Sequence, residues 1–275
     1  MKYTPSLPEH NDNVSHTHPL GEFVLLFSGI LIILSCAFWA AGLFVDYAVA
    51  YVTPELEAKI FSGFKVPDAE IVDAGDPGQA ALQGLVDGLE TCVGIGFPLK
   101  VYLVDSDQAN AVALPGGRIL VLSGLLHKVR SENGLAFVLA HELGHFKNRD
   151  HLRGMGRGIV ITALSALITG AGSDFTQLFA PSVSLNMAQY SQDRERLADQ
   201  AALKALGCYY GHGGGAAEFF RAMTFEGSRA KSLIGHYFDS HPQALERIEA
   251  LERLAGEMGL GKGTVKSLPP IFLVK

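Results

Sequence analysis

The hydrophobic pattern begins with a long uncharged stretch, residues 23–45, which lies between Glu22 and Asp46. A helix over this stretch, rising 1.5 Å per residue, would reach roughly 34 Å, enough to cross the hydrocarbon core of a bilayer. The alternative is a cleaved signal peptide, with residues 48–50 (A-V-A) as its small-residue cleavage site. Signal peptides have a basic first region and a shorter apolar core, so the favoured interpretation is a retained single-pass transmembrane helix.

The segments on either side of this stretch have no apolar core of their own. Residues 1–22 are polar and show no periodicity, which is typical of a disordered tail. Residues 46–66 are expected to form a connector, with Thr53 as an N-cap and Pro54 at the first helical position. The basic residues within twenty positions of the stretch are two lysines that follow it. These two lysines weakly favour a cytoplasmic position of the domain and do not decide on which side of the membrane it lies.

Residues 67–258 alternate between helical and strand periods and predict one α+β domain that is mostly α-helical. An amphipathic helix is expected at 77–96, where glycines end it. Three short strands follow, and a Pro-Gly-Gly turn joins the last two. The strands are expected at 100–104, 111–114 and 118–122. The last two form either a plain hairpin or an open edge that could hold an extended peptide as an added strand.

Helical patterns dominate the rest of the domain. Residues 132–151 are largely apolar and predict a buried helix. The apolar run at 159–168 is too short to cross a bilayer, so the 158–184 segment is expected to pack in the core or lie against the membrane, covering a cleft. Further helices are expected at 186–206, where Gly207 ends the helix, at 216–225 and at 240–258. Residues 259–275 form a tail in which 271–274 could add an edge strand.

Composition limits the class of protein. A chain of 275 residues with 48% hydrophobic content can bury a full core, which indicates one domain with a small appendage. The net charge of −6, without a run of Lys and Arg, argues against nucleic acid as a partner. Because Cys36 falls in the apolar stretch, at most Cys92 and Cys208 could form a disulfide. The redox compartment stays open on this evidence.

The candidate chemistry lies in residues 141–145, H-E-L-G-H. On a helix, His141 and His145 share one face, where two imidazoles can converge on a metal ion. Glu142 lies about 100° round the helix from His141, close enough to reach a metal-bound water without being a ligand. This is the H-E-x-x-H arrangement of zinc peptidases. The other interpretation is a buried helix whose histidines bond to backbone carbonyls.

A catalytic zinc needs a third protein ligand and an open position for water. His151 has the metzincin spacing from His145, although Asn148 stands where that pattern has glycine. Glu195 is the second candidate and lies on another predicted helix further along the chain. It shares a face with Asp199, so one carboxylate could bind the metal while the other holds a ligand histidine in its tautomer.

Four motifs in order carry a resemblance to a known family. They are Asn110-Ala111 leading into Pro115-Gly116-Gly117-Arg118-Ile119, His141-Glu142-Leu143-Gly144-His145, Glu195 with Ala198-Asp199, and Ser240-His241-Pro242 with Arg247. Over about residues 65 to 255 the chain resembles the HtpX-like and CAAX-prenyl-protease family of membrane zinc metallopeptidases, and among them the single-anchor members. The resemblance implies a gluzincin-type domain with a small β-sheet before the active-site helix.

The resemblance also implies roles for single residues. By it Glu195, and not His151, joins His141 and His145 in holding one Zn²⁺ ion per chain. Glu142 is then the general base, which takes a proton from the metal-bound water and delivers it to the leaving amine.

The sequence leaves alternative roles open for several residues around this centre. Asn110 and Ala111 are expected to bind substrate, since a gluzincin holds the peptide as an added strand. His241 is either a loop residue beside a helix start or a catalytic group that donates to the oxyanion or occupies the open metal position. Arg247 could pair with Asp199 or with a ligand carboxylate.

The implied function is that of a membrane-anchored zinc metalloendopeptidase that hydrolyses peptide bonds of membrane-associated or misfolded proteins. Its expected partners are a protein or peptide substrate and a lipid bilayer, which residues 23–45 would span. The alternative is a membrane-tethered chaperone or binding module with the same fold and little or strongly regulated proteolysis.

Overall fold

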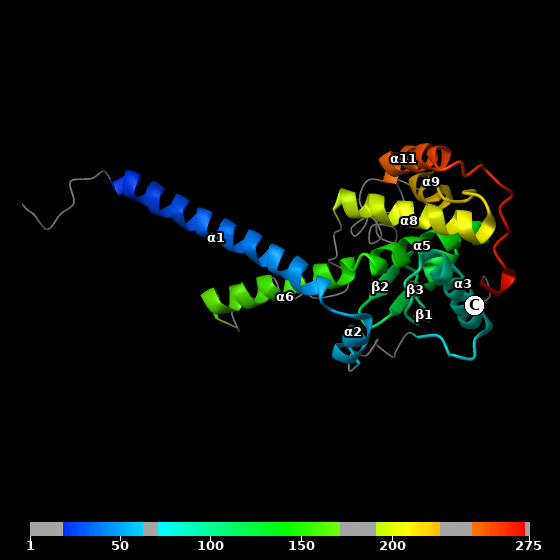
Figure 1. The fold of residues 1–275 in the computed structure, drawn as a ribbon, viewed down its shortest axis with the longest axis horizontal. Coiled ribbons are helices and arrows are strands. Elements are labelled where there is room, and N and C mark those ends of the chain that lie inside the picture. The colour runs from blue at the N-terminus through cyan, green and yellow to red at the C-terminus, as the bar shows by residue number, and fades with distance from the viewer. Residues whose placement is uncertain (1–18, 63–70, 171–190, 226–243, 273–275) are drawn as a thin grey trace, which may run out of the picture. The chain divides into compact units, whose positions relative to one another are not determined.

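The computed structural model describes residues 19–62, 71–170, 191–225 and 244–272. The chain divides into two compact units, Met1–Phe44 and Val45–Lys275. Figure 1 labels most of the helices and strands that these ranges contain.

Helix α1 (Pro19–Ala50) is the apolar element expected near the N-terminus, and it extends beyond the uncharged stretch at both ends. Its large apolar side chains up to Phe44 are mostly exposed. Among the described residues, α1 is the one helix whose length and composition suit a membrane crossing. A helix that exposes apolar side chains around its surface is typical of a lipid-facing segment.

The connector forms helix α2 (Pro54–Ile60), which begins as expected because Thr53 Oγ1 accepts a hydrogen bond from Leu56 N at 3.2 Å. Glu57 of this helix is only 1% exposed. Its Oε1 accepts a hydrogen bond from the backbone N–H of Gly116 at 2.7 Å. The connector is therefore attached to the strand turn of the domain by a buried carboxylate.

A three-stranded mixed sheet forms the base of the domain, in the order β1-β3-β2. Strand β3 lies in the middle, parallel to β1 and antiparallel to β2. The strand bounds are those that the sequence predicts: β1 Lys100–Val104, β2 Ala111–Leu114 and β3 Arg118–Leu122. The predicted turn between β2 and β3 is also confirmed, with Gly116 and Gly117 both at positive φ. Turns of this kind favour glycine because it lacks a Cβ.

Helix α3 (Pro77–Val93) determines which edge of the sheet stays open. Its Gln79 and Gln83 side chains exchange hydrogen bonds with the backbone of β1 and of Leu99 just before it, at distances between 2.6 and 3.0 Å. These side chains occupy the outer edge of β1, and within the part of the chain that the structure describes β2 is the edge strand with no further strand beside it. The helix ends at Gly94 in the left-handed conformation, slightly earlier than expected.

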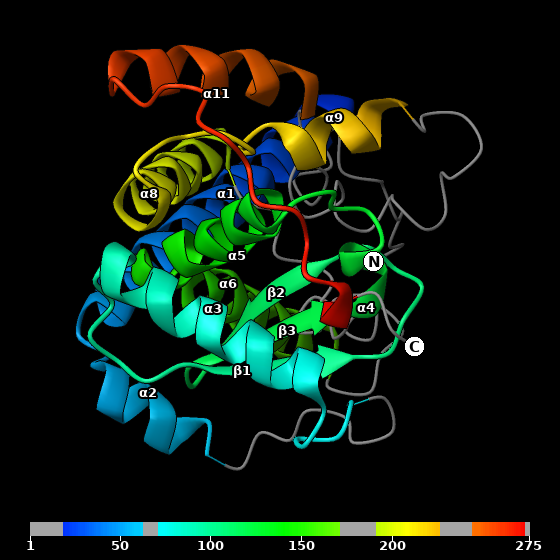
Figure 2. The same cartoon turned by 90° about the vertical axis from the view of Figure 1, so that its right-hand side faces the viewer.

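Helix α5 (Glu132–Lys147) lies between the sheet and α8 (Gln192–Tyr210), as Figure 2 shows, and its residues from Asn133 to Phe146 are all buried. The two helices pack closely at Gly144. A Cβ added there would lie 2.9 Å from Ala198 Cα, too near for any other residue. This close packing places the first turns of α8 beside the H-E-L-G-H motif.

The remaining helices are α4 (Ser123–Leu126), α6 (Asp150–Thr169), α9 (Glu218–Phe225), α11 (Ala244–Glu257) and the 3₁₀ helix η3 (Pro270–Phe272). They pack around the elements described above: α4 on β3, α6 against α5, α9 on α5 and α11, α11 on α8, and η3 on α3. The α+β fold, mostly helical with a small sheet before the central helix, is thus confirmed.

A disulfide joins Cys92 to Cys208, with their Cα atoms 5.8 Å apart. It connects the ends of α3 and α8, which are far apart in the sequence. Cys36 is the free cysteine and is exposed on α1. The Cys92–Cys208 disulfide is the pairing that the sequence allowed.

Two expectations about helix and tail ends are wrong. Helix α8 continues through Gly207 to Tyr210 and has Gly211 as its left-handed C-cap. The glycine at 207 allows Leu260 to pack closely, since a Cβ there would lie 2.6 Å from the leucine side chain. Along the tail, Leu268 and Phe272 are buried in the main core. Apolar burial draws this segment onto the domain, and residues 271 and 272 lie in a 3₁₀ turn where the expected edge strand would begin, while 273 and 274 lie outside the described residues.

Candidate metal centre

His141 and His145 lie on one face of α5 and are both 0% exposed. One helical turn separates them, so their rings point into the same space. Their Nε2 atoms are 3.0 Å apart. Two buried imidazole nitrogens at this distance need either a proton between them or a shared cation.

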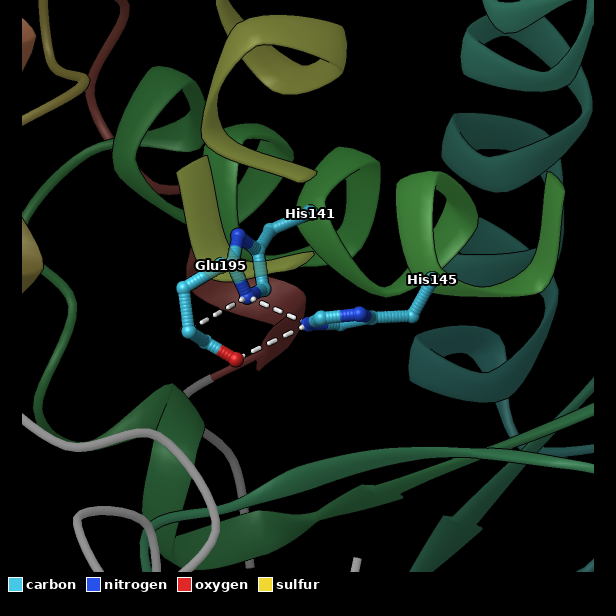
Figure 3. A group of neighbouring side chains, drawn as sticks. All are labelled: His141, His145 and Glu195. Carbon is cyan, nitrogen blue, oxygen red and sulfur yellow. Dashed lines mark hydrogen bonds and ion pairs between the residues drawn. The ribbon is translucent and has the colours of Figure 1, made fainter. Parts of the chain in front are cut away.

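Glu195 enters the same space from the first turn of α8 (Figure 3). Its Oε2 lies 3.4 Å from His141 Nε2, and its Oε1 lies 3.3 Å from His145 Nε2. Ligands bound to zinc at about 2.0 Å in a tetrahedron are about 3.3 Å from one another. The three donors therefore match the spacing of a four-coordinate zinc site.

The far side of each imidazole is held by a carboxylate. Asp199 Oδ1 lies 2.9 Å from His141 Nδ1, and Asp150 Oδ2 lies 3.0 Å from His145 Nδ1. A carboxylate that accepts the Nδ1 proton leaves the Nε2 lone pair for a metal, which is the usual arrangement around metal-bound histidines. The role of Asp199 is the one expected from the sequence, whereas Asp150 was not predicted.

Arg247 of α11 lies against both carboxylates of α8. Its Nη1 is 2.6 Å from Glu195 Oε2, and its Nη2 and Nε lie 2.6 and 3.0 Å from the two Asp199 oxygens. The guanidinium also stacks over Phe220, 4.4 Å from the ring centre. Burial would raise the pKa of Asp199, but Arg247 and His141 hold that pKa below its ordinary value.

Glu142 is 1% exposed and lies beside the cluster without joining it. Its Oε2 accepts a hydrogen bond from Ala113 N of β2 at 3.2 Å. Leu122 N of β3 donates to Asn110 O, so Ala111 and Ala113 are the residues whose N–H groups turn away from β3. The outward edge of β2 therefore faces the candidate base.

Residues 78–255, more than half of the chain, match Peptidase family M48. The chain belongs to this family. The M48 match confirms the resemblance that the four motifs suggest, and it covers the sheet, α5, α8 and most of α11.

Several curated relatives of the M48 domain are named proteases. The chain is 29% identical over 170 residues to Metalloprotease YcaL of Escherichia coli (strain K12), covering 58% of this chain and 64% of that protein. It is 25% identical over 232 residues to a Protease HtpX homolog of Thermococcus kodakarensis, covering 70% and 79%. It is 26% identical over 172 residues to Mitochondrial metalloendopeptidase OMA1 of Schizosaccharomyces pombe, covering 60% and 49%. Of the HtpX homolog of Desulfatibacillum aliphaticivorans it spans only 29%.

The M48 centre is strongly attractive to a positive charge. Burial lowers the pKa of His141, but hydrogen bonds to Asp199 and Glu195 outweigh it and raise that pKa to about 9. Without a metal, the cluster therefore carries a proton at neutral pH, and a metal ion must displace it to bind.

His151 is placed away from the M48 donors. Its Nε2 lies 3.0 Å from Glu57 Oε1, and its ring stacks on Phe146 at 4.7 Å. The turn before it does not use Asn148 as the left-handed residue that would replace the metzincin glycine. Asn148 has φ −77°, and Arg149 takes φ 58° instead.

The other residues that the sequence singles out divide into two groups. Asn110 and Ala111 lie at the start of β2, where Asn110 Oδ1 accepts a hydrogen bond from Ala111 N at 2.9 Å. His241 lies outside the described residues, as does the start of the helix expected at residue 240. The one signal for Asp150 in the sequence is its position, five residues after His145 and directly before His151.

Proposed function

We propose that the chain is a zinc-dependent endopeptidase of the M48 family, with His141, His145 and Glu195 as the metal ligands. The observation that carries the proposal is the convergence of three buried side chains: the two Nε2 atoms are 3.0 Å apart, and Glu195 brings Oε2 to 3.4 Å from His141 Nε2 and Oε1 to 3.3 Å from His145 Nε2. Two neutral imidazoles and one carboxylate, with a fourth position left for water, are a donor set typical of catalytic zinc.

The metal, when bound, lowers the pKa of its water and polarises the scissile carbonyl. With the metal in place, Glu142, which is buried beside the cluster, would take a proton from the attacking water and pass it to the leaving amine. Asp199 keeps His141 in the tautomer that presents Nε2, and Arg247 holds Asp199 and Glu195 together.

The substrate is expected to bind as an extended strand along β2. The outward N–H groups of Ala111 and Ala113 would then donate to peptide carbonyls, with Asn110 at the end of the strand. In the free protein the Ala113 N–H donates to Glu142, so an arriving peptide would take over this donor and release the carboxylate for proton transfer. Main-chain pairing of this kind favours unfolded segments over folded ones.

Removal of the metal is the direct test of the function. The full-length protein in detergent, dialysed against a zinc chelator, should lose all cleavage of reduced casein, and about one molar equivalent of Zn²⁺ should restore it. A thermal melt of the dialysed sample controls for unfolding. Cleavage that survives removal of the metal would contradict the proposal. A protein that binds zinc and casein but cleaves nothing would favour the binding or chaperone module.

We further propose that α1 is a single-pass anchor and that the substrates are membrane-associated or misfolded proteins. The support for the anchor is the length and apolar surface of α1. A site tethered by such a helix would sample chains close to the bilayer, and the strand edge of β2 would accept those that are unfolded.

The Cys92–Cys208 disulfide favours an oxidising compartment for the M48 domain. Disulfides persist outside the cytoplasm and are rare inside it, where thiol systems keep cysteines reduced. Cys208 is exposed, so a reducing environment would reach it. We therefore propose that the domain lies on the extracytoplasmic side, although the two lysines after the apolar stretch weakly favour the cytoplasm.

Thiol trapping tests this assignment in the cells that make the protein. In a Cys36→Ser background, acid-quenched and denatured samples should show no maleimide shift before reduction and a shift of two labels after it. The Cys92→Ser variant supplies the control, because it leaves Cys208 free and should shift by one label without reductant. Two reactive thiols in the unreduced sample would overturn the extracytoplasmic placement.

A further inference from the structure

Two buried carboxylate–histidine pairs have their histidines at the turn between α5 and α6, and one of them takes its carboxylate from the distant helix α2. Asp150 Oδ2 lies 3.0 Å from His145 Nδ1, and Glu57 Oε1 lies 3.0 Å from His151 Nε2. All four residues are at most 5% exposed. The pairs differ in one respect: His145 also presents a nitrogen to the candidate metal centre, whereas His151 does not.

The backbone of the turn brings Asp150 back beneath the ring of His145. Helix α5 ends at Lys147, Arg149 adopts φ 58°, and α6 starts at Asp150. A left-handed residue between two helices reverses the chain within a few residues, at a local cost for a residue that has a Cβ. The structure thus keeps a strained residue at the position that directs the Asp150 carboxylate to His145.

Asp150 is held from its other side by arginines. Its Oδ1 lies 3.4 Å from Arg194 Nε and 3.8 Å from Arg153 Nη1. Arg194 directly precedes Glu195 on α8, so the same stretch of chain supplies a metal ligand and a counter-charge for Asp150. One oxygen of Asp150 therefore faces the ligand histidine while the other is fixed by α8.

We propose that Asp150 is the positioning residue of the metal centre for His145, a role equivalent to that of Asp199 for His141. The inference rests on the proposed zinc site. By accepting the Nδ1 proton, Asp150 fixes the tautomer and the ring plane of His145 and increases the basicity of its Nε2. The two ligand histidines then each have a buried carboxylate behind them, one from α6 and one from α8.

Zinc affinity of Asp150 variants, measured by chelator competition on the full-length protein, tests the role. Asp150→Asn keeps an acceptor for the Nδ1 proton and removes the charge, so zinc binding should weaken by about 10-fold. Asp150→Ala removes the acceptor as well and should weaken it by up to about 100-fold. In the cobalt-substituted protein, the visible absorption of Asp150→Ala should also shift, because the ring of His145 is no longer held.

Glu57→Gln is the matched control, since it changes the other buried carboxylate–histidine pair. It should lower the melting temperature as much as Asp150→Asn does, while leaving zinc affinity and the cobalt spectrum unchanged. Equal zinc affinity in wild type and both Asp150 variants would overturn the inference and leave the zinc site standing. So would an equal loss in Glu57→Gln, because the effect would then be one of stability. A wild-type protein that binds no zinc would overturn the proposed function itself.

Discussion

Glu142→Gln is expected to lower kcat for casein cleavage by about 10²- to 10⁴-fold while the protein keeps its zinc. That range is the usual contribution of a general acid–base group. Zinc is retained because Glu142 is not one of the three clustered donors. The glutamine amide can still accept the Ala113 N–H, so the contact between α5 and the edge strand survives. What is lost is the group that takes the proton from the metal-bound water.

The measurement pairs initial rates with the zinc content of the same preparation. Glu132→Gln is a suitable control, because Glu132 lies on the same helix and accepts a hydrogen bond from Tyr210 OH, outside the metal cluster. This control should retain most of its activity. Undiminished cleavage by Glu142→Gln would rule out Glu142 as the base, and loss of its zinc would mean that the carboxylate is needed to hold the metal.

Glu195→Ala should release the metal, whereas His151→Ala should keep it. Glu195 supplies one of the three donors, so its loss should weaken zinc by more than the roughly 100-fold expected at most for a positioning residue. The substitution also removes the Glu195 carboxylate that contacts the buried Arg247 guanidinium beside His141. The positive charge of Arg247 would then repel a cation from the site. His151 contacts Glu57 and Phe146 instead of the donors.

The two variants separate two classes of zinc peptidase. Zinc content after gel filtration should be close to zero for Glu195→Ala and close to one per chain for His151→Ala, with circular dichroism as the check on folding. The opposite result, with zinc lost from His151→Ala and kept by Glu195→Ala, would indicate a metzincin-like ligand set. Glu195→Asp is a useful intermediate, because a shorter carboxylate keeps the charge but not the reach.

Local signals predict the parts of this fold that depend on near neighbours in the chain. The bounds of all three strands follow from short alternating runs and from the two turn glycines. The cap at Thr53 follows from residue type, as does the αL end at Gly94. The pairing of His141 with His145 follows from helical periodicity alone. Each of these requires no knowledge of what packs against the segment.

Expectations fail where a distant segment decides the outcome. Gly207 has the composition of a helix end, but it lies inside α8, where its missing side chain leaves room for Leu260 of a distant segment. The tail has Gly and Pro in abundance, yet Phe272 is buried in the core. A charged residue after a helix, such as Asp150, is usually a surface residue. The reversed turn at Arg149 places it against His145.

By itself the sequence determined the family motifs, the helix that carries two imidazoles and a carboxylate, and a stretch long enough to span a bilayer. Only the tertiary structure decided that Glu195 and not His151 meets those imidazoles, that Asp150 and Asp199 stand behind them, and that Cys92 pairs with Cys208. The reason is physical: periodicity records which side chains share a face, whereas the convergence of two faces depends on how closely the helices pack. Here that closeness comes from the absent side chain of Gly144 against Ala198.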